Sequence, residues 1–324
     1  MNMNSGRILL IDAMNMYIRN YVCNPSITLH GRPVGGLKGF LASMAKSIRM
    51  TNPQKIFIVW DGAGGSIRRK SQNKNYKSGR TPIRLNRELK ISPNDELKNK
   101  IWQQENLIMY LKLLPVVQIS IEGLEADDVI AQICFDQSHL QKVIVSNDKD
   151  FYQLCDRTTV VYRPTPDKLI NTNRVIEEHG VHPLNFSLAR AICGDKSDNL
   201  KGVPRVGLKT LTKRLSIFSS SDNITFDKLY RECRIKESSS KVKIFKDILE
   251  NKKIIEENYR IMQLYVPSMS MPSVAKIREA IMEDDWYLNK NEIYRMVSRH
   301  GIEGFDWDSL FSLFRRVLDS RKEV

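Results

Sequence analysis

The sequence predicts an α/β fold with a central, mostly parallel sheet, and three features of the chain support this. Short apolar runs recur along the first half, helical patterns lie between them, and the runs are apolar at consecutive positions. Strands of that kind are buried on both faces, as in parallel sheets covered by helices. With 324 residues, 41% of them hydrophobic, the chain can form one large domain or two modest ones.

The predicted elements alternate along the chain. We expect strands at Arg7–Ile11, Lys55–Trp60, Pro115–Ile119, Lys142–Val145 and Thr159–Tyr162. Helical patterns fall near 36–50, 95–112 and 125–137. After about residue 173 the strand signal fades, and the remainder is typical of helices. Ser-rich and Pro-containing stretches interrupt them at 216–223, 237–240 and 266–273.

Charge and composition exclude several classes of protein. Lys and Arg number 51 and Asp and Glu 37, so the net charge is +14, which favours a polyanionic partner, most often nucleic acid. A merely soluble basic protein is the alternative. No apolar run reaches the ~18 residues of a membrane span, and the N-terminus lacks a signal-peptide pattern. The five scattered cysteines form no CxxC pair, so we expect a reducing, cytoplasmic location without disulfides or zinc.

Carboxylates follow three of the predicted strands, at the point where each strand ends. Asp12 ends ILLID, Asp61 ends IFIVWD, and Asp148 and Asp150 follow VIVSN. The carboxyl ends of parallel strands meet at one edge of a sheet, where functional residues gather. Further acids lie in GLEADD and GDKSDN, namely Glu125, Asp127, Asp128, Asp195 and Asp198.

This set of carboxylates predicts a site for divalent metal ions. Close carboxylates repel one another at low dielectric, and without a cation some of them would take up protons. Oxygen ligands suit Mg²⁺ or Mn²⁺, and two such ions about 3.5–4 Å apart are the usual device for hydrolysing a phosphodiester. Taken singly, each acid also fits a turn, a helix cap or a first helical turn. Their joint occurrence favours the metal site.

A strongly basic segment, residues 68–90, follows the acidic strand end at Asp61. It carries nine basic residues and one acid, behind a GAGG sequence. Cations beside an aromatic ring hold single strands through phosphate contact and base stacking, and a mobile basic segment facing a metal cluster acts as a lid. A solvated basic loop is the alternative. The candidate contacts are Arg68, Arg69, Lys70, Tyr76, Lys77 and Arg80.

The stretch GVPRVGLKTLTKRL, residues 202–215, is typical of a tight hairpin between two helices. Glycines let backbone amides approach a phosphate closely, and the following helix is basic. Such hairpins contact the DNA backbone without reading bases. A plain junction between helices is the alternative. The candidate contacts are Gly202, Val203, Arg205, Val206, Gly207, Lys209, Thr210 and Lys213.

Together, these motifs resemble the 5′ nuclease family of flap endonucleases and 5′–3′ exonucleases. LLIDAMN, VWDG, NYKSGR, EADD, SNDKDF and GDKSDNLKGVPRVGLKT occur in that order over roughly residues 6–215. Within the family, the chain resembles stand-alone bacteriophage members, such as the T-even phage ribonuclease H. The resemblance implies a PIN-like core at 1–185 with a helical arch at about 64–95. It also implies a helix–three-turn–helix DNA-binding region at 186–265 and a helical C-terminal segment of unknown role at 266–324.

Carried over by position, the resemblance implies a site for two Mg²⁺ ions, with Mn²⁺ as a substitute. The first ion would be held by Asp12, Asp61, Glu125 and Asp127, and the second by Asp148, Asp150 and Asp195, with Asp127 between them. Asp128 and Asp198 match further acids with an outer role. Lys77 and Arg80 would approach the scissile phosphate and, with Asp127, make the catalytic set. Gly202, Val203, Val206 and Gly207 fall on the hairpin, which often holds K⁺ in the family.

The function that the resemblance implies is Mg²⁺-dependent cleavage of DNA near the junction of a 5′ single strand and a duplex, in replication or repair. The expected partners are flap, nicked or junction DNA, RNA–DNA hybrids and replication proteins, for a monomer in the host cytoplasm if phage-encoded. Two alternatives stay open: a primer ribonuclease or junction resolvase on the same scaffold, and a DNA-structure binder without catalysis. Arg205 departs from the family hairpin, where Gly is common, which puts the tight turn and the K⁺ site in question.

Overall fold

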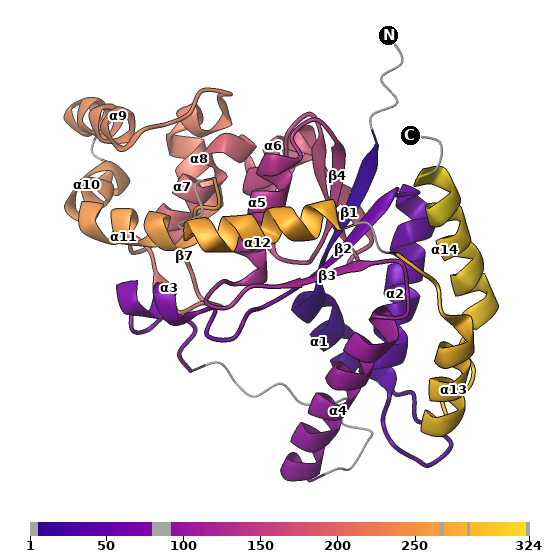
Figure 1. Ribbon diagram of the computed structural model, residues 1–324. Helices are drawn as coiled ribbons and strands as arrows, with labels where there is room; N and C mark the ends of the chain where they lie inside the picture. Colours follow the sequence, from indigo (N-terminus) through magenta and orange to yellow (C-terminus); the bar gives the residue numbers. More distant parts are fainter. Residues whose placement is uncertain (1–5, 80–91, 241, 266–268, 284–285, 322–324) are drawn as a thin grey trace.

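The computed structural model describes residues 6–79, 92–240, 242–265, 269–283 and 286–321 of the chain (Figure 1). Its centre is a six-stranded sheet in the order β3-β2-β1-β4-β5-β6. The first five strands along the chain pair in parallel, and β6 runs antiparallel to β5. The strands are β1 (Arg7–Asp12), β2 (Lys55–Trp60), β3 (Val117–Ser120), β4 (Gln141–Val145), β5 (Thr159–Arg163) and β6 (Lys168–Ile170).

The mostly parallel sheet and its five predicted strands are confirmed, with strand ends that differ by at most two residues. Two features of the strands were not predicted. β6 has three residues, too few to form a recognisable apolar run. The other is a small antiparallel hairpin of β7 (Gly194–Asp195) and β8 (Leu200–Lys201), which lies in the region predicted to be helical.

Helices cover both faces of the sheet, as the continuous apolar strands predict. Leu9 and Ile11 of β1 point into one hydrophobic cluster, whereas Ile8 and Leu10 point into the other. The first cluster is completed by α1 (Ala13–Cys23), α2 (Gly35–Thr51), α4 (Pro93–Leu111), α13 (Lys290–His300) and α14 (Trp307–Arg321). The second includes α5 (Ala126–Asp136), η1 (Lys149–Leu154), α7 (Pro183–Cys193) and α12 (Met271–Met282). Each layer therefore fixes the sheet from its own side.

Further helices extend the second cluster away from the sheet (Figure 1). They are α6 (Thr172–His179), α8 (Leu208–Arg214), η2 (Ser216–Ser219), α9 (Phe226–Ser239), α10 (Lys243–Glu250) and α11 (Lys252–Met262). The short helix α3 (Ile67–Gln72) adds no side chain to this cluster, and its buried residue is Arg69. α11 packs along α7, which in turn packs on η1 at the end of β4. This chain of contacts positions the β7–β8 hairpin beside the carboxyl edge of the sheet.

The predicted helices near 36–50, 95–112 and 125–137 are confirmed as α2, α4 and α5. The predicted interruption at 237–240 is wrong in part, because α9 continues through Ser239. The hydroxyls of Ser238 and Ser239 donate to the Ile235 carbonyl, 2.8 and 3.1 Å away, so these serines are satisfied within the helix. No helix in the described part of the chain is long and apolar enough to cross a membrane.

Candidate metal centre

Four carboxylates stand at the carboxyl ends of three neighbouring strands, as predicted. Asp12 is the last residue of β1, Asp61 follows β2, and Asp148 and Asp150 follow β4. Because β1 lies between β2 and β4, these ends meet at one edge of the sheet. The strand order also changes direction between β1 and β4, and such switch points form crevices in open α/β sheets. The fold therefore gathers the acids where sequence reasoning expected them.

Asp12 and Asp61 are held by the elements that follow their strands. Asp12 caps α1 by accepting from the Asn15 amide at 3.1 Å, and its second oxygen accepts from the Ser146 hydroxyl at 2.9 Å. Asp61 accepts from the amide of Ala126 at 2.9 Å, which ties β2 to the start of α5. Burial raises the pKa of Asp12 to about 7 and also raises the pKa of Asp61. A cation bound beside these two buried carboxylates would favour their ionised form.

The first turn of α5 carries an acidic group, Glu125, Asp127 and Asp128, that surrounds a buried arginine. The Arg69 guanidinium is only 3% exposed and pairs with all three, at 3.0 Å from Asp127 and 3.1 Å from Asp128. Burial raises the pKa of Asp128 to about 6, with Asp127 adding to the effect. Arg69 therefore supplies a positive charge to all three carboxylates.

Glu125 has two further partners from the basic segment. Its oxygens accept from the Tyr76 hydroxyl at 3.0 Å and from the Lys77 ammonium at 2.7 Å. Burial alone would raise the pKa of Glu125, but Arg69 and Lys77 lower it below its ordinary value. Glu125 therefore stays ionised in a buried position.

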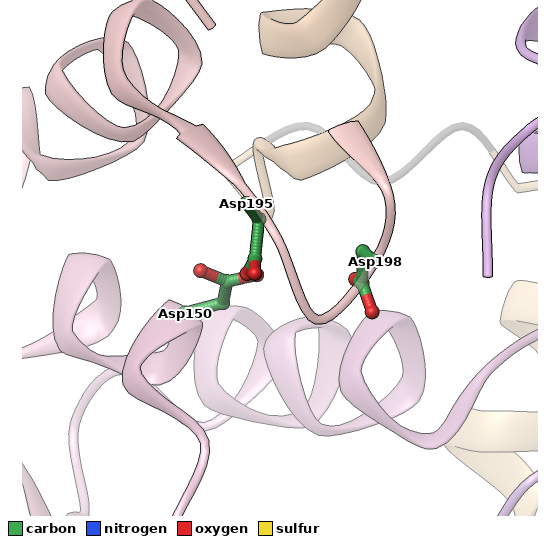
Figure 2. A group of neighbouring side chains, drawn as sticks. All are labelled: Asp150, Asp195 and Asp198. Atoms are coloured by element: carbon green, nitrogen blue, oxygen red, sulfur yellow. The ribbon is translucent and has the colours of Figure 1, made fainter. Parts of the chain in front are cut away.

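A second acidic group lies at the β7–β8 hairpin. Asp150, Asp195 and Asp198 each offer a carboxylate oxygen, and these oxygens lie within 4.8 Å of one another. Figure 2 shows Asp150 reaching from η1 toward the β7–β8 hairpin, which carries Asp195 at the end of β7 and Asp198 in its loop. Asp148 caps η1 by accepting from the amide of Asp150 at 2.8 Å. This is a site with oxygen ligands from two elements, which suits a hard divalent cation.

The electrostatics of this second group also favour a cation. Burial raises the pKa of Asp150 to about 8, and neighbouring Asp148 adds to the effect. Arg190 of α7 partly offsets it, since its Nε donates to Asp150 at 3.2 Å and its Nη2 pairs with Asp195. Asp195 also accepts from the amide and hydroxyl of Ser197, both at 2.7 Å. The chemistry of these oxygen donors fits a hard divalent cation.

The described part of the basic segment bridges the two acidic groups. The Lys77 amide donates to the Asp198 carbonyl at 2.9 Å, while the Lys77 ammonium contacts Glu125. Asn199 extends the link, because its side-chain amide donates to Ser78 at 2.8 Å. The described part of the segment therefore links the two acidic groups, and its action as a lid stays a prediction. Arg80 was predicted to act here, but it lies outside the described residues.

Several predicted DNA contacts have other surroundings in this conformation. Arg69 and Tyr76 are each 3% exposed and face carboxylates, so neither side chain is presented at the surface. Arg68 pairs with Asp128 at 2.9 Å and is half-buried, whereas Lys70 is exposed. Some basic side chains of the segment therefore pair with carboxylates, whereas others face the solvent.

The glycine hairpin lies between α7 and α8, as predicted. Gly202 packs so closely that a Cβ would lie 2.2 Å from the Cys193 carbonyl carbon. Val203 and Val206 are buried, whereas a basic edge is exposed. Arg205 has φ +63°, a left-handed conformation that glycine adopts easily. An arginine in this conformation strains the backbone, because its Cβ crowds the neighbouring carbonyl. The exposed residues of this edge are Arg205, Gly207, Lys209, Thr210 and Lys213.

Sequence reasoning missed Arg190, which pairs with both Asp150 and Asp195. The sequence feature that could have identified Arg190 is its position as a single cation inside the apolar stretch SLARAIC, five residues before Asp195. A lone cation in an otherwise buried helix requires an anionic partner. The acids of the next loop were the nearest candidates.

Comparisons with known proteins agree with this arrangement. Residues 7–180 match the family described as "5′-3′ exonuclease, N-terminal resolvase-like domain". The chain is 30% identical over 230 residues to a 5′-3′ exonuclease of Aquifex aeolicus, covering 69% of this chain and 75% of that one. It is also 30% identical over 222 residues to thermostable DNA polymerase I of Thermus thermophilus, covering 68% of this chain. The match spans only 25% of the length of that polymerase.

A solved structure of the bacteriophage T5 flap endonuclease has a similar fold. That structure is a pseudo-enzyme-product complex with DNA and metal ions, and it aligns with a TM-score of 0.61 at 14% identity. The alignment covers 98% of this chain and 99% of the T5 protein. The similarity therefore extends through the C-terminal helices, beyond the residues that the family model matches.

Proposed function

The chain belongs to the 5′-3′ exonuclease family, and we propose that it is a structure-specific 5′ nuclease that cuts DNA where a 5′ single strand meets a duplex. The observation that carries the proposal is the convergence of carboxylates from β1, β2, β4, α5 and the β7–β8 hairpin on one edge of the sheet. Binding alone would gain from losing these charges, because carboxylates repel the DNA backbone. Their presence therefore supports catalysis.

Two divalent ions, Mg²⁺ with Mn²⁺ as a substitute, are proposed as cofactors. Asp12, Asp61, Glu125 and Asp127 would hold one ion, and Asp148, Asp150 and Asp195 the other. When bound, paired ions of this kind activate water and neutralise charge on a phosphodiester. Asp128 of the first acidic group and Asp198 of the second are proposed to orient the ligands from an outer position.

The basic residues are proposed to bind and position the DNA. Lys77, now 2.7 Å from Glu125, would turn its ammonium to the scissile phosphate and stabilise the charge that develops there. Arg80 is proposed for the same task from outside the described residues. The exposed side chains of Arg205, Lys209 and Lys213 would contact the duplex backbone, with K⁺ bound at the hairpin. The enzyme is proposed to act as a monomer in replication or repair.

The test compares four end-labelled substrates with Mg²⁺ and with EDTA: a 5′ flap, a nicked duplex, an RNA–DNA hybrid and a four-way junction. We expect metal-dependent cleavage that is fastest on the flap and located at its junction. Fastest cleavage of the hybrid or of the four-way junction would identify a primer ribonuclease or a resolvase instead. Tight binding without cleavage of any substrate would favour a DNA-structure binder.

A matched pair of variants connects the activity to the metal centre. Asp195→Asn should abolish cleavage and weaken Mn²⁺ binding measured by electron paramagnetic resonance. Asp222→Asn is the control, because that carboxylate is 70% exposed and pairs with Lys228 at 3.3 Å, away from the acidic groups. Equal activity of the two variants would contradict the assignment.

A further inference from the structure

A cavity of about 620 Å³ opens beside the metal centre, where α3, the start of α7 and the end of α11 meet. Figure 1 shows α3 lying next to α11, on the side of the molecule away from α13 and α14. The volume is within the range of about 300–1,000 Å³ that is usual for small-molecule sites. Arg68 lines the cavity and also pairs with Asp128 of the first acidic group, so the cavity adjoins the proposed cleavage site.

The walls of the cavity combine cations, aromatic rings and amides. The cations are Arg68 and Arg260, the rings are Tyr259 and Tyr265, and two of the amides are Gln72 and Gln263. Of the described residues that line the cavity, none is acidic. Guanidinium groups bind phosphate, aromatic rings stack on bases, and side-chain amides hydrogen-bond to base edges. The combination fits a nucleotide better than a bare anion or an apolar ligand.

Three of these side chains are fixed before any ligand arrives. The Tyr265 hydroxyl donates to the carbonyls of Pro183, at 3.0 Å, and Gln153, so its ring is held in the wall. The ring of Tyr259 packs edge-on against Phe226, with centroids 5.3 Å apart. Arg68 is anchored by its ion pair with Asp128. A preformed wall lowers the entropic cost of binding a ligand.

Arg260 differs from these residues because its charge is available. Its side chain is exposed, and within the described ranges it forms no ion pair. It lies on the last turn of α11, one residue from Tyr259. A phosphate bound by Arg260 would therefore place its attached base within reach of the two tyrosine rings.

We propose that this cavity binds one unpaired nucleotide of the 5′ strand, next to the cleavage site, with its phosphate on Arg260 and its base against Tyr259 and Tyr265. The inference rests on the proposed function and adds a nucleotide subsite to it. The subsite gives the enzyme a reason to prefer a 5′ flap to a nick, since a nick has no unpaired nucleotide to fill it.

The first test measures binding of thymidine 5′-monophosphate in EDTA by saturation-transfer NMR, which needs neither metal nor cleavage. Arg260→Met keeps the aliphatic stem and should weaken binding about 10-fold, as expected for one charge-assisted contact. Lys253→Met is the matched control, because Lys253 is exposed on the same helix and does not line the cavity. Equal binding by the two variants would overturn the proposal. So would binding of inorganic phosphate as tight as that of the nucleotide.

The second test decides whether the nucleotide belongs to the substrate. Arg260→Met should raise the KM for a flap with one unpaired nucleotide about 10-fold more than the KM for a nicked duplex, whereas Lys253→Met should not separate them. Weakened mononucleotide binding with no such separation would overturn the assignment to the 5′ strand and identify a site for free nucleotide. If the wild-type protein cuts neither DNA, the proposed function fails, and the metal-free titration still decides whether the cavity binds a nucleotide.

Discussion

Replacing Arg69 by methionine should destabilise the metal-free protein strongly and the metal-bound protein much less. The side chain is 3% exposed, and its partners Glu125 and Asp128 are 6% and 2% exposed, so the substitution leaves two buried carboxylates without their shared cation. Breaking a buried ion pair from one side costs about 3–5 kcal/mol. Lys77 still pairs with Glu125 and Arg68 with Asp128, which places the expected loss near the lower limit, at about 3 kcal/mol.

Thermal and urea unfolding in EDTA and in saturating Mn²⁺ measure this effect. A loss of that size should lower the melting temperature in EDTA by about 4 °C. Mn²⁺ should recover most of it, because the ion supplies the missing charge, so metal stabilises the variant more than the wild type. Arg295→Met is the control: it breaks an ion pair to Glu292 that is 74% exposed on the arginine side, and should cost less than about 0.5 kcal/mol. An Arg69 variant as stable as the control in EDTA, or equally destabilised with and without Mn²⁺, would refute the reasoning.

Three further predictions concern the second acidic group and the hairpin beside it. Folding raises the pKa of Asp150 from 3.8 to about 8, so its contribution to stability is fully present below pH 3.8 and is lost as the pH rises through about 8. Unfolding measured across this range in EDTA should show that loss, and Mn²⁺ at pH 8 should reverse it; a flat profile would contradict the burial argument. Gly202→Ala should cost more than about 1 kcal/mol and weaken Mn²⁺ binding, because its Cβ would lie 2.2 Å from the Cys193 carbonyl carbon. Gly207→Ala, with nothing within 4 Å, should leave both measurements unchanged. Lys213→Gln should reduce the slope of log affinity for duplex DNA against log salt by about 0.9 if the residue contacts one phosphate; an unchanged slope in fluorescence anisotropy would remove it from the interface.

Much of the sheet could be predicted because each parallel strand is a continuous apolar run with a polar residue at its end. β2 illustrates this: Lys55–Trp60 is buried at five of six positions, and Asp61 follows at once. α1 was missed because Asn15 and Asn20 interrupt its apolar pattern. Its start is instead encoded by Asp12, which caps the helix and is also a candidate metal ligand. Because Asp12 fits both a helix cap and a metal ligand, its presence in the sequence does not by itself indicate the start of a helix.

The acids of the site could be predicted, but their cationic partners could not. A basic segment in a sequence gives no sign of which side chains face solvent and which face carboxylates, because tertiary packing decides this. Lys70 is exposed and its neighbour Arg69 is buried against three acids, although the two look equivalent in the sequence. Arg190 is missed for the same reason, since its partners lie on η1 and on the β7–β8 hairpin. The cavity that is proposed to bind a nucleotide likewise joins α3 to α11, which are far apart along the chain.

The gathered carboxylates are proposed to form a metal-dependent cleavage centre. Cleavage of a 5′-labelled flap duplex tests it most directly, with Mg²⁺, with EDTA and with the Asp148→Ala variant. Cutting at the flap junction that requires Mg²⁺ and is lost in the variant is the predicted result. Tight binding of the same flap without cutting, or cutting that survives EDTA or the loss of Asp148, would contradict it.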